Sequence, residues 1–314
     1  GNSWSLSTGT DDKKRKNPIT DESNFRLASI TKTFTASVIF KLIEEGKLSI
    51  DDKLNTFFPE YTNAPNVTIK NLLDHSSGIK ELLTLPDILM SSTLNTDKVW
   101  DINQIVATIA QKKLVFETGT DHQYSNTNTV LLGLISQKVT GKKMSELYRE
   151  YLFNAINIYN IIFSPYEGTP DLLVSGYDRK LLPTTGLYEV TAKNTAWATS
   201  AFTSGALVAT SGEAALYFHN LFMGKILSGN SIAVMKSVEE ANKPDNEYLT
   251  YFGKGLFKWD INGNTYYGHE GVFVGFDNIA GFREKDKTTI VILGNISTYN
   301  KFDLLGEIDA IISL

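Results

Sequence analysis

The chain has 314 residues, of which 42% are hydrophobic and 21% charged, and its formal net charge is −5. This is a globular composition, with enough chain for one large or two medium domains. The acidic balance argues against a nucleic-acid partner, because phosphate binding needs a basic face. The absence of cysteine excludes disulfides, thiolate metal sites and thiol catalysis, and it fits an oxidising compartment.

Two expectations concern where the protein works. No apolar run approaches the roughly 18 residues of a membrane helix, so we expect no integral membrane segment. No signal peptide is visible, and the chain opens at Gly1 rather than at a methionine. We therefore expect a removed signal and an extracytoplasmic location, which is periplasmic, secreted or associated with the cell envelope.

The first part of the chain predicts a strand and then a long helix. Alternating residues indicate a strand near 3–8, and the basic run at 13–16 is expected at a solvated hairpin tip. Apolar residues recur at helical spacing from Ile30 to Ile43, and Gly46 ends the run as a C-terminal cap does. A loop with turns is expected over 48–61. A short helix within 68–79 then ends in a polar turn.

The middle of the chain has helical periodicity from about 84 to 160, and Gly141 divides the segment 127–152 into two helices. A loop-rich stretch follows from about 163 to 200, and a helix is expected over 206–227. The last part is rich in strand-forming residues at 251–263, 265–284 and 288–295, which predicts an antiparallel meander. A helix over 302–314 closes the chain.

These elements predict an α/β fold of the α+β type, with an antiparallel sheet flanked by helices and an inserted all-helical domain. Packing the two ends of the chain together gives one sandwich domain, 1–60 with 205–314. The residues between them, 61–204, then form the mostly helical domain. We expect the active site at the interface of the two.

The pair Ser29 and Lys32 stands at the start of the first long helix. Residues three apart share a helix face, so the hydroxyl and the amine can meet there. The helix N-terminus adds free N–H groups and positive potential, and a lysine that loses solvent can accept a proton. An ordinary helix start with a solvated lysine remains open. The same spacing recurs at Ser77 and Lys80, but that pair lies in a turn.

Tyr124 and Asn126 form a second candidate pair, in a polar loop before an apolar helix. A phenol near a lysine can carry protons, and an amide can hold a lysine and a substrate amide together. The alternative is a half-buried loop aromatic and an N-terminal helix cap. Tyr61 and Asn63 repeat the spacing, so the pattern alone is weak.

His269 and Gly271 lie in the β-rich end of the chain, in the run "YYGHEGVFVGF". A strand glycine often marks the close approach of another backbone or a ligand, and a strand edge beside a nucleophile offers N–H groups for an oxyanion hole. A surface strand histidine is the alternative. The four histidines have no metal-ligand spacing, so neither a metal nor another cofactor is expected.

Together, the Ser-x-x-Lys, Tyr-x-Asn and His-x-Gly motifs resemble those of the serine penicillin-recognising enzymes. This superfamily contains the penicillin-binding DD-peptidases, the serine β-lactamases and related esterases and D-aminopeptidases. The chain is similar to the class C β-lactamase-like branch. Flanking blocks such as "FRLASITKTFTA", "TIKNLLDHSSGI" and "GHEGVFVGF" follow in the family's order from about 3 to 312. The resemblance implies a bacterial type of protein.

The resemblance implies the role of each motif residue. Ser29 attacks a carbonyl and forms an acyl-enzyme. Lys32 takes its proton or keeps Tyr124 anionic, and Tyr124 shuttles the proton to the leaving group. The division of the base role between the two stays open, because a coupled pair titrates as a unit.

The remaining motif residues are implied to bind the substrate. Asn126 positions the substrate amide, while His269 and Gly271 line the edge along which the substrate lies. The backbone N–H groups of Ser29 and Val272 form the oxyanion hole.

His269 replaces the lysine of the family's Lys-Thr-Gly element. Imidazole is largely neutral at neutral pH, so a substrate carboxylate is held less well and strong β-lactamase activity is disfavoured. We expect a serine hydrolase acting on a D-amino-acid peptide, such as a peptidoglycan stem, or a related amide. A β-lactamase, an esterase and a non-catalytic penicillin-binding sensor are the alternatives. The family usually begins with elements before the strand at 3–8, so we expect a missing N-terminal piece.

Overall fold

A computed structural model describes residues 3–11, 17–178, 188–190, 194–240 and 251–314. Every structural statement below, including any absence or count, refers to these residues. The basic run at 13–16, predicted as a hairpin tip, lies outside them. So does part of the loop-rich stretch predicted over 163–200.

Six described strands form one antiparallel sheet in the order β11-β10-β9-β8-β7-β6. Each strand pairs with its neighbour in the chain, so the predicted meander is confirmed. The strands are β6 (Glu239–Glu240), β7 (Tyr251–Phe252), β8 (Phe257–Ile261), β9 (Asn264–Phe273), β10 (Phe276–Arg283) and β11 (Thr289–Gly294).

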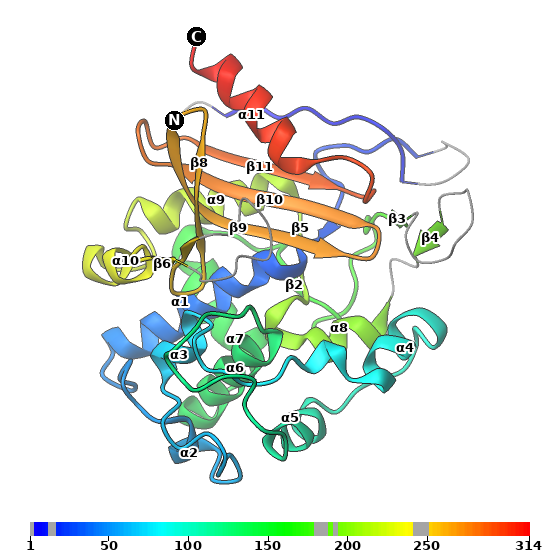
Figure 1. Ribbon diagram of the computed structural model, residues 1–314. Helices are drawn as coiled ribbons and strands as arrows, with labels where there is room; N and C mark the ends of the chain where they lie inside the picture. Colours follow the sequence, from blue (N-terminus) through cyan, green and yellow to red (C-terminus); the bar gives the residue numbers. More distant parts are fainter. Residues whose placement is uncertain (1–2, 12–16, 179–187, 191–193, 241–250) are drawn as a thin grey trace.

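Helices cover both faces of this sheet (Figure 1). Helix α11 (Lys301–Ile312) packs on one face against β8, β10 and β11. Helix α9 (Ser211–Phe222) packs on the other face against β10 and β11, and α1 (Thr31–Glu44) contacts β9. The predicted fold class, an antiparallel sheet flanked by helices, is confirmed.

The other helices lie mostly below α1 in Figure 1. They are α2 (Leu54–Phe57), α3 (Ile69–Leu73), α4 (Pro86–Leu94), α5 (Ile102–Ala110), α6 (Asn126–Thr140), α7 (Met144–Tyr148), α8 (Thr195–Ala201) and α10 (Gly229–Met235). The predicted break near Gly141 is confirmed, because that glycine ends α6 with a φ of 70°. The short strands β1 (Phe25–Arg26), β5 (Leu207–Ala209) and β2 (Ile162–Phe163) make a second sheet, and β3 (Gly176–Asp178) pairs with β4 (Tyr188–Val190).

Helix α1 is buried on nearly all sides, which is why it holds the site in place. Polar side chains in it are satisfied by distant backbone: Thr33 donates to the Gly255 carbonyl (2.9 Å) and Thr35 to the Thr203 carbonyl (2.7 Å). A helix buried all round lies in the core of a protein. The N-terminal end of α1 is therefore fixed between the sheet and α6.

The predicted strand near 3–8 is wrong. Trp4 and Leu6, which carry the apolar half of the alternation, are 71% and 83% exposed. Ser5 and Ser7 donate instead to the carboxylate of Asp21, and no strand is assigned there. Alternation predicts a strand only where one side is buried against a core, and here neither side is.

Two other boundaries differ from prediction. The first residues of the helix predicted over 206–227 form β5, and α9 begins only after Thr210, whose hydroxyl caps it with Glu213 as a capping box. The run of apolar residues before that cap pairs with β1 and β2. The loop predicted over 48–61 contains the short helix α2. The division into domains at 60 and 205 stays a prediction.

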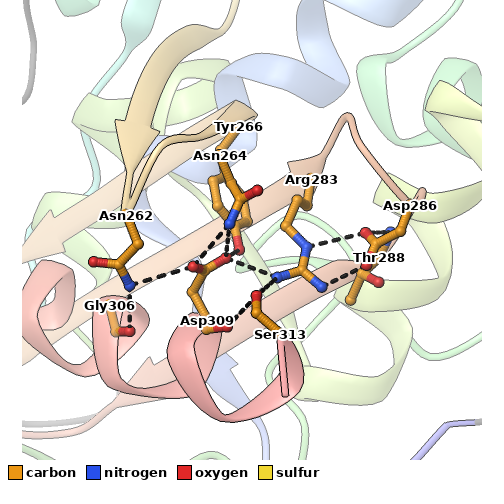
Figure 2. A network of polar contacts seen from close by, with 9 residues as sticks. All are labelled: Asn262, Asn264, Tyr266, Arg283, Asp286, Thr288, Gly306, Asp309 and Ser313. Carbon is orange, nitrogen blue, oxygen red and sulfur yellow. Dashed lines mark hydrogen bonds and ion pairs between the residues drawn. The ribbon is translucent and has the colours of Figure 1, made fainter.

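A buried polar network fastens α11 to the sheet (Figure 2). The Asp309 carboxylate, 1% exposed, accepts from Arg283 Nη1 of β10 at 2.8 Å and from Asn264 Nδ2 of β9 at 3.0 Å. It also accepts from the Tyr266 hydroxyl and from Asn262 Nδ2. A buried carboxylate needs such partners, so this network determines where α11 lies on the sheet.

Candidate active site

Ser29 lies in a tight turn between β1 and α1, the 3₁₀ turn η1 (Ala28–Ile30). Ala28 has a φ of +50°, a left-handed conformation that costs energy for a residue with a Cβ. Ala28 and Ile30 are fully buried, whereas Ser29 between them is partly exposed. The strained turn thus leaves the serine accessible at the N-terminal end of α1.

Lys32 is 1% exposed and its amine has three partners. Its Nζ lies 3.0 Å from Ser29 Oγ, 2.7 Å from Asn126 Oδ1 and 2.8 Å from the Ser204 carbonyl oxygen. An amide oxygen and a carbonyl oxygen can only accept, so they occupy two N–H groups of the lysine. The third position faces the serine, and in the neutral amine that position is the lone pair. The geometry suits transfer of the Ser29 proton to Lys32.

The protonation of Lys32 follows from its burial. Loss of solvent lowers the pKa of Lys32 from 10.5 to about 7, and the negative charge of Glu81 opposes that shift. An amine with this pKa is present in both forms at neutral pH. The open alternative of a solvated lysine is therefore wrong, because Lys32 is buried at the serine.

Tyr124 lies in the loop before α6, and its ring faces Lys32, with Nζ 4.8 Å from the ring centroid. The ring centroids of His75 and His269 lie 4.8 Å and 6.3 Å from that of Tyr124. The structure thus brings Tyr124 to the lysine that the sequence paired with it. Its role in proton transfer stays a prediction.

Asn126 is the first residue of α6, and its side chain lies between two charged groups. Its Oδ1 accepts from Lys32, and its Nδ2 donates to Glu81 Oε1 at 3.1 Å. The backbone N–H of Asn126 also donates to the Glu81 carboxylate. Sequence reasoning missed Glu81. The nearest signal is a carboxylate three residues after Gly78, and nothing local distinguishes it from a solvated side chain.

Gly271 of β9 packs against the turn that carries Ser29. A Cβ at Gly271 would lie 2.1 Å from the Leu27 carbonyl oxygen, so any larger residue would push β9 away from η1. Strand β8 pairs with β9 only from Asn264 to Gly268. Beyond that point, β9 has β10 on one side and η1 on the other, which places its unpaired edge at the serine.

Val272 is 55% exposed and lies on this edge. Phe273 pairs with Phe276 across a two-residue turn, and Val272 pairs with Asp277. Hydrogen-bonded and non-hydrogen-bonded pairs alternate in an antiparallel ladder, and the pair next to such a turn is hydrogen-bonded. The N–H of Val272 is therefore directed away from β10, toward the side where Ser29 lies.

His269 is buried rather than exposed at the edge, so the surface-histidine alternative is wrong. It is 1% exposed, and its Nδ1 donates to the Glu270 carbonyl at 2.6 Å because a carbonyl can only accept. Burial, with the charge of Lys32, holds the pKa of His269 well below its usual range. The ring is neutral at neutral pH and stacks 4.6 Å from Phe257.

His75 has a structural position behind the tyrosine. Its Nδ1 accepts from the Ser125 backbone N–H at 3.2 Å and lies 3.2 Å from Asn128 Nδ2. Burial and the charge of Lys32 lower the pKa of His75 from 6.5 to about 3. This neutral ring fixes the loop that carries Tyr124.

The two repeats of the motif spacing are structural. Ser77 is buried and donates to Asn128 Oδ1 at 2.7 Å, while Lys80 is exposed. Tyr61 is buried and donates to the Val106 carbonyl at 2.9 Å, while Asn63 is exposed. In neither repeat do the two side chains meet.

No described helix is both long and apolar enough to span a bilayer. In the same part of the chain, no three His, Asp or Glu side chains gather in a way that could hold a metal ion.

Comparison with known proteins identifies the family. The model of the family named Beta-lactamase matches residues 1–310. A D-amino acid amidase from Ochrobactrum anthropi SV3, solved with L-phenylalanine amide, is 25% identical, with a TM-score of 0.80 over 92% of this chain and 81% of that one. A penicillin-binding protein from Bacillus halodurans, 20% identical, shares the fold with a TM-score of 0.81 over 98% and 92%.

A curated relative from Escherichia coli (strain K12), whose name gives D-alanyl-D-alanine carboxypeptidase as a candidate activity, is 29% identical over 150 residues. The match covers 45% of this chain but 34% of the relative, so the chain spans about a third of that protein's length. The family model, in contrast, extends over nearly all of this chain. The chain therefore belongs to the Beta-lactamase family, and it is a hydrolase of the serine β-lactamase and penicillin-binding protein superfamily.

Proposed function

We propose that this hydrolase cleaves amides of D-amino acids, in the manner of a DD-peptidase, through an acyl-enzyme at Ser29. The observation that carries the proposal is the buried Lys32 amine, 3.0 Å from the Ser29 hydroxyl and fixed by two further acceptors. The similarity to a D-amino acid amidase and to a protein named as a candidate D-alanyl-D-alanine carboxypeptidase supports the substrate class.

The first chemical step follows from the protonation of the lysine. Neutral Lys32 accepts the Ser29 proton while Ser29 Oγ attacks the substrate carbonyl, which gives a tetrahedral intermediate. The N–H groups of Ser29 and Val272 stabilise its oxyanion. Tyr124 then delivers the proton to the leaving amine, the C–N bond breaks, and the acyl group stays on Ser29.

The second step is hydrolysis. Water enters as the leaving amine departs, gives a proton to the Tyr124–Lys32 pair and attacks the acyl carbonyl. The bond between that carbonyl and Ser29 Oγ breaks, and the serine recovers a proton. Lys32 and Tyr124 thus return to their starting state, and the net reaction consumes one water for one amide bond.

The neutral state of His269 favours an amide or peptide over a β-lactam. A permanent cation at this position would hold a substrate carboxylate, whereas a neutral, buried ring leaves that binding weak. His269 instead packs on Phe257, and it and Gly271 define the edge along which the substrate lies. Asn126 contributes its second amide N–H to the substrate.

We further propose that the protein acts outside the cytoplasm, where peptidoglycan stems occur. The lack of cysteine supports this location. The net charge of −5 supports small or peptide substrates rather than nucleic acid.

The test is the intact mass of the protein after mixing with benzylpenicillin, together with hydrolysis of D- and L-phenylalanine amide and a p-nitrophenyl ester. We expect an adduct that is absent in Ser29→Ala and preference for the D-amide. Rapid penicillin turnover without an adduct would identify a β-lactamase, and ester cleavage alone an esterase. A stable adduct with no amide or ester turnover would identify a sensor. Full activity in Ser29→Ala would refute the mechanism.

A further inference from the structure

Glu81 has more contacts than a surface carboxylate normally makes. One oxygen accepts from the Leu83 backbone N–H at 2.8 Å and from Asn126 Nδ2 at 3.1 Å. The other oxygen accepts from the Asn126 backbone N–H. Glu81 therefore caps two elements, the 3₁₀ turn η2 (Leu82–Thr84) and α6, and it also holds the side chain of the first residue of α6.

These contacts determine which way the Asn126 amide points. A carboxylate can only accept, so Nδ2 must face Glu81, and the oxygen is left to face the amine of Lys32. The opposite orientation would place an oxygen against a carboxylate and an NH₂ group against an amine. The order carboxylate, amide, amine is thus the one arrangement in which every contact is attractive.

Lys32 is held beside Ser29 through this chain of contacts. Its other fixed partner is the Ser204 carbonyl, a backbone group that cannot reorient. Asn126 is therefore the one side-chain acceptor that positions the amine apart from Ser29 itself. If the amide rotated, Lys32 would lose an acceptor at 2.7 Å and the amine would no longer be fixed against Ser29 Oγ.

The charge of Glu81 also acts on the lysine. The titratable groups that face Lys32 are Glu81 before η2, His75 after α3, Tyr124 before α6 and His269 of β9. His75 and His269 are buried, and the pKa of each is lowered, so both are neutral at pH 7. Among these groups, Glu81 supplies the negative charge that opposes the desolvation of Lys32.

We propose that Glu81 is a positioning residue for the reaction at Ser29, which it serves by holding the Asn126 amide oxygen against Lys32. The proposal rests on the acylation of Ser29 proposed above. Glu81 touches neither Ser29 nor the reacting atoms, so its effect is transmitted by Asn126 and by charge. It has two consequences, one for the rate and one for the pH at which the lysine titrates.

Glu81→Gln separates these consequences from simple loss of structure. The new NH₂ group faces Asn126 Nδ2, so the asparagine rotates and Lys32 loses its acceptor. We expect kcat/KM for the D-amide to fall at least tenfold. Loss of the negative charge disfavours protonated Lys32, so the acidic limb of the pH–rate profile moves down by about one unit.

The double variant E81Q/N126D provides the matched rescue. The carboxylate introduced at position 126 accepts from Lys32 with one oxygen and from the new amide at position 81 with the other. The pairing and the net charge are therefore both restored. We expect this variant to recover at least half of the loss in log(kcat/KM) that Glu81→Gln causes. Glu307→Gln, an exposed glutamate of α11, controls for removal of a charge far from the site.

Titration of the Lys32 amine by NMR, assigned with Lys32→Arg, gives a readout that needs no activity. Melting curves establish that each variant is folded. An unchanged Lys32 titration and pH profile in folded Glu81→Gln, or no recovery in E81Q/N126D, would overturn the positioning role. If the unmodified protein neither forms an adduct nor cleaves amide or ester, the proposed function fails, while the Lys32 titration still decides whether Glu81 acts on the lysine.

Discussion

The amine of Lys32 lies 3.0 Å from the hydroxyl of Ser29 while being 1% exposed to solvent. Hydrogen-bond contact brings the proton acceptor to the nucleophile, and burial lowers the pKa of the amine to about 7, where it can accept. Both conditions are required of a general base. The first prediction separates this basicity from the positive charge alone.

Lys32→Arg keeps the charge but removes the base, because a guanidinium stays protonated. We expect the rate of acylation of Ser29 to fall about 1,000-fold. The measurement is the appearance of the benzylpenicillin adduct by mass spectrometry. Lys80→Arg, the exposed lysine of the repeated spacing, should react at the normal rate. A rate within tenfold of normal in Lys32→Arg would exclude Lys32 as the base.

Lys32→Met should change the pH dependence of stability. The pKa of Lys32 is about 7 in the folded protein and about 10.5 when exposed, so between these values the unfolded chain binds the proton more. Stability from this group is therefore lowest below pH 7 and rises as the pH rises toward 10.5. Relative to Lys32→Met, the normal protein should gain about 3 kcal/mol between pH 7 and pH 10.

The measurement is urea unfolding of both proteins at pH 7, 8, 9 and 10. The difference between the two proteins cancels the titration of the other groups. A difference that is constant over this range would show that Lys32 titrates at the same pH in the folded and unfolded chain.

Gly271→Ala should separate β9 from the turn that carries the nucleophile. The added Cβ would lie 2.1 Å from the Leu27 carbonyl oxygen, so the strand or the turn must move. We expect a loss of about 2 kcal/mol in unfolding free energy and about 100-fold in kcat/KM. Gly229→Ala, where a Cβ meets no atom within 4 Å, should be neutral in both. Normal activity in Gly271→Ala would show that β9 need not lie against the serine.

Ser77→Ala and Ser29→Ala should have opposite effects. Ser77 is buried and donates to Asn128, which loses that partner in the variant, so we expect a cost of about 1–3 kcal/mol with acylation retained. Ser29→Ala should leave stability nearly unchanged and abolish acylation. Thermal melting and adduct formation are measured on both proteins. Loss of acylation in a folded Ser77→Ala would contradict a purely structural role for that serine.

Asp309→Ala should loosen α11 from the sheet without touching the site. The change leaves the buried Arg283 without the partner 2.8 Å away, and we expect a cost of about 3–5 kcal/mol in urea unfolding. Glu307→Gln on the same helix should change stability by less than about 0.5 kcal/mol. The folded variant should still be acylated at Ser29. Equal stability in Asp309→Ala and Glu307→Gln would mean that the network adds nothing.

The long helix after Ser29 and the terminal meander were predictable because their patterns are local. Apolar residues at helical spacing mark α1, and strand-forming runs separated by turns mark β8 to β11. The strand predicted at 3–8 and the helix predicted to begin at 206 were wrong for one common reason. Periodicity does not say what a segment packs against, and that decides whether an alternating or apolar run becomes a strand.

The sequence by itself determined the motif residues Ser29, Lys32, Tyr124 and Asn126, because their types and order carry the family resemblance. It could not distinguish Ser77 or Tyr61 from them by spacing. The tertiary structure decided that question by burial: one serine meets a buried amine, and the other meets an asparagine.

Only the tertiary structure also revealed Glu81, the buried state of His269 and the contact of Gly271 with Leu27. Each depends on residues 45 to 244 positions apart in the chain or on the loss of solvent, neither of which a local pattern encodes. The physical reason is that a carboxylate, an imidazole or a glycine takes its role from what surrounds it. The sequence names the groups that can react, and folding determines their distances and their charges.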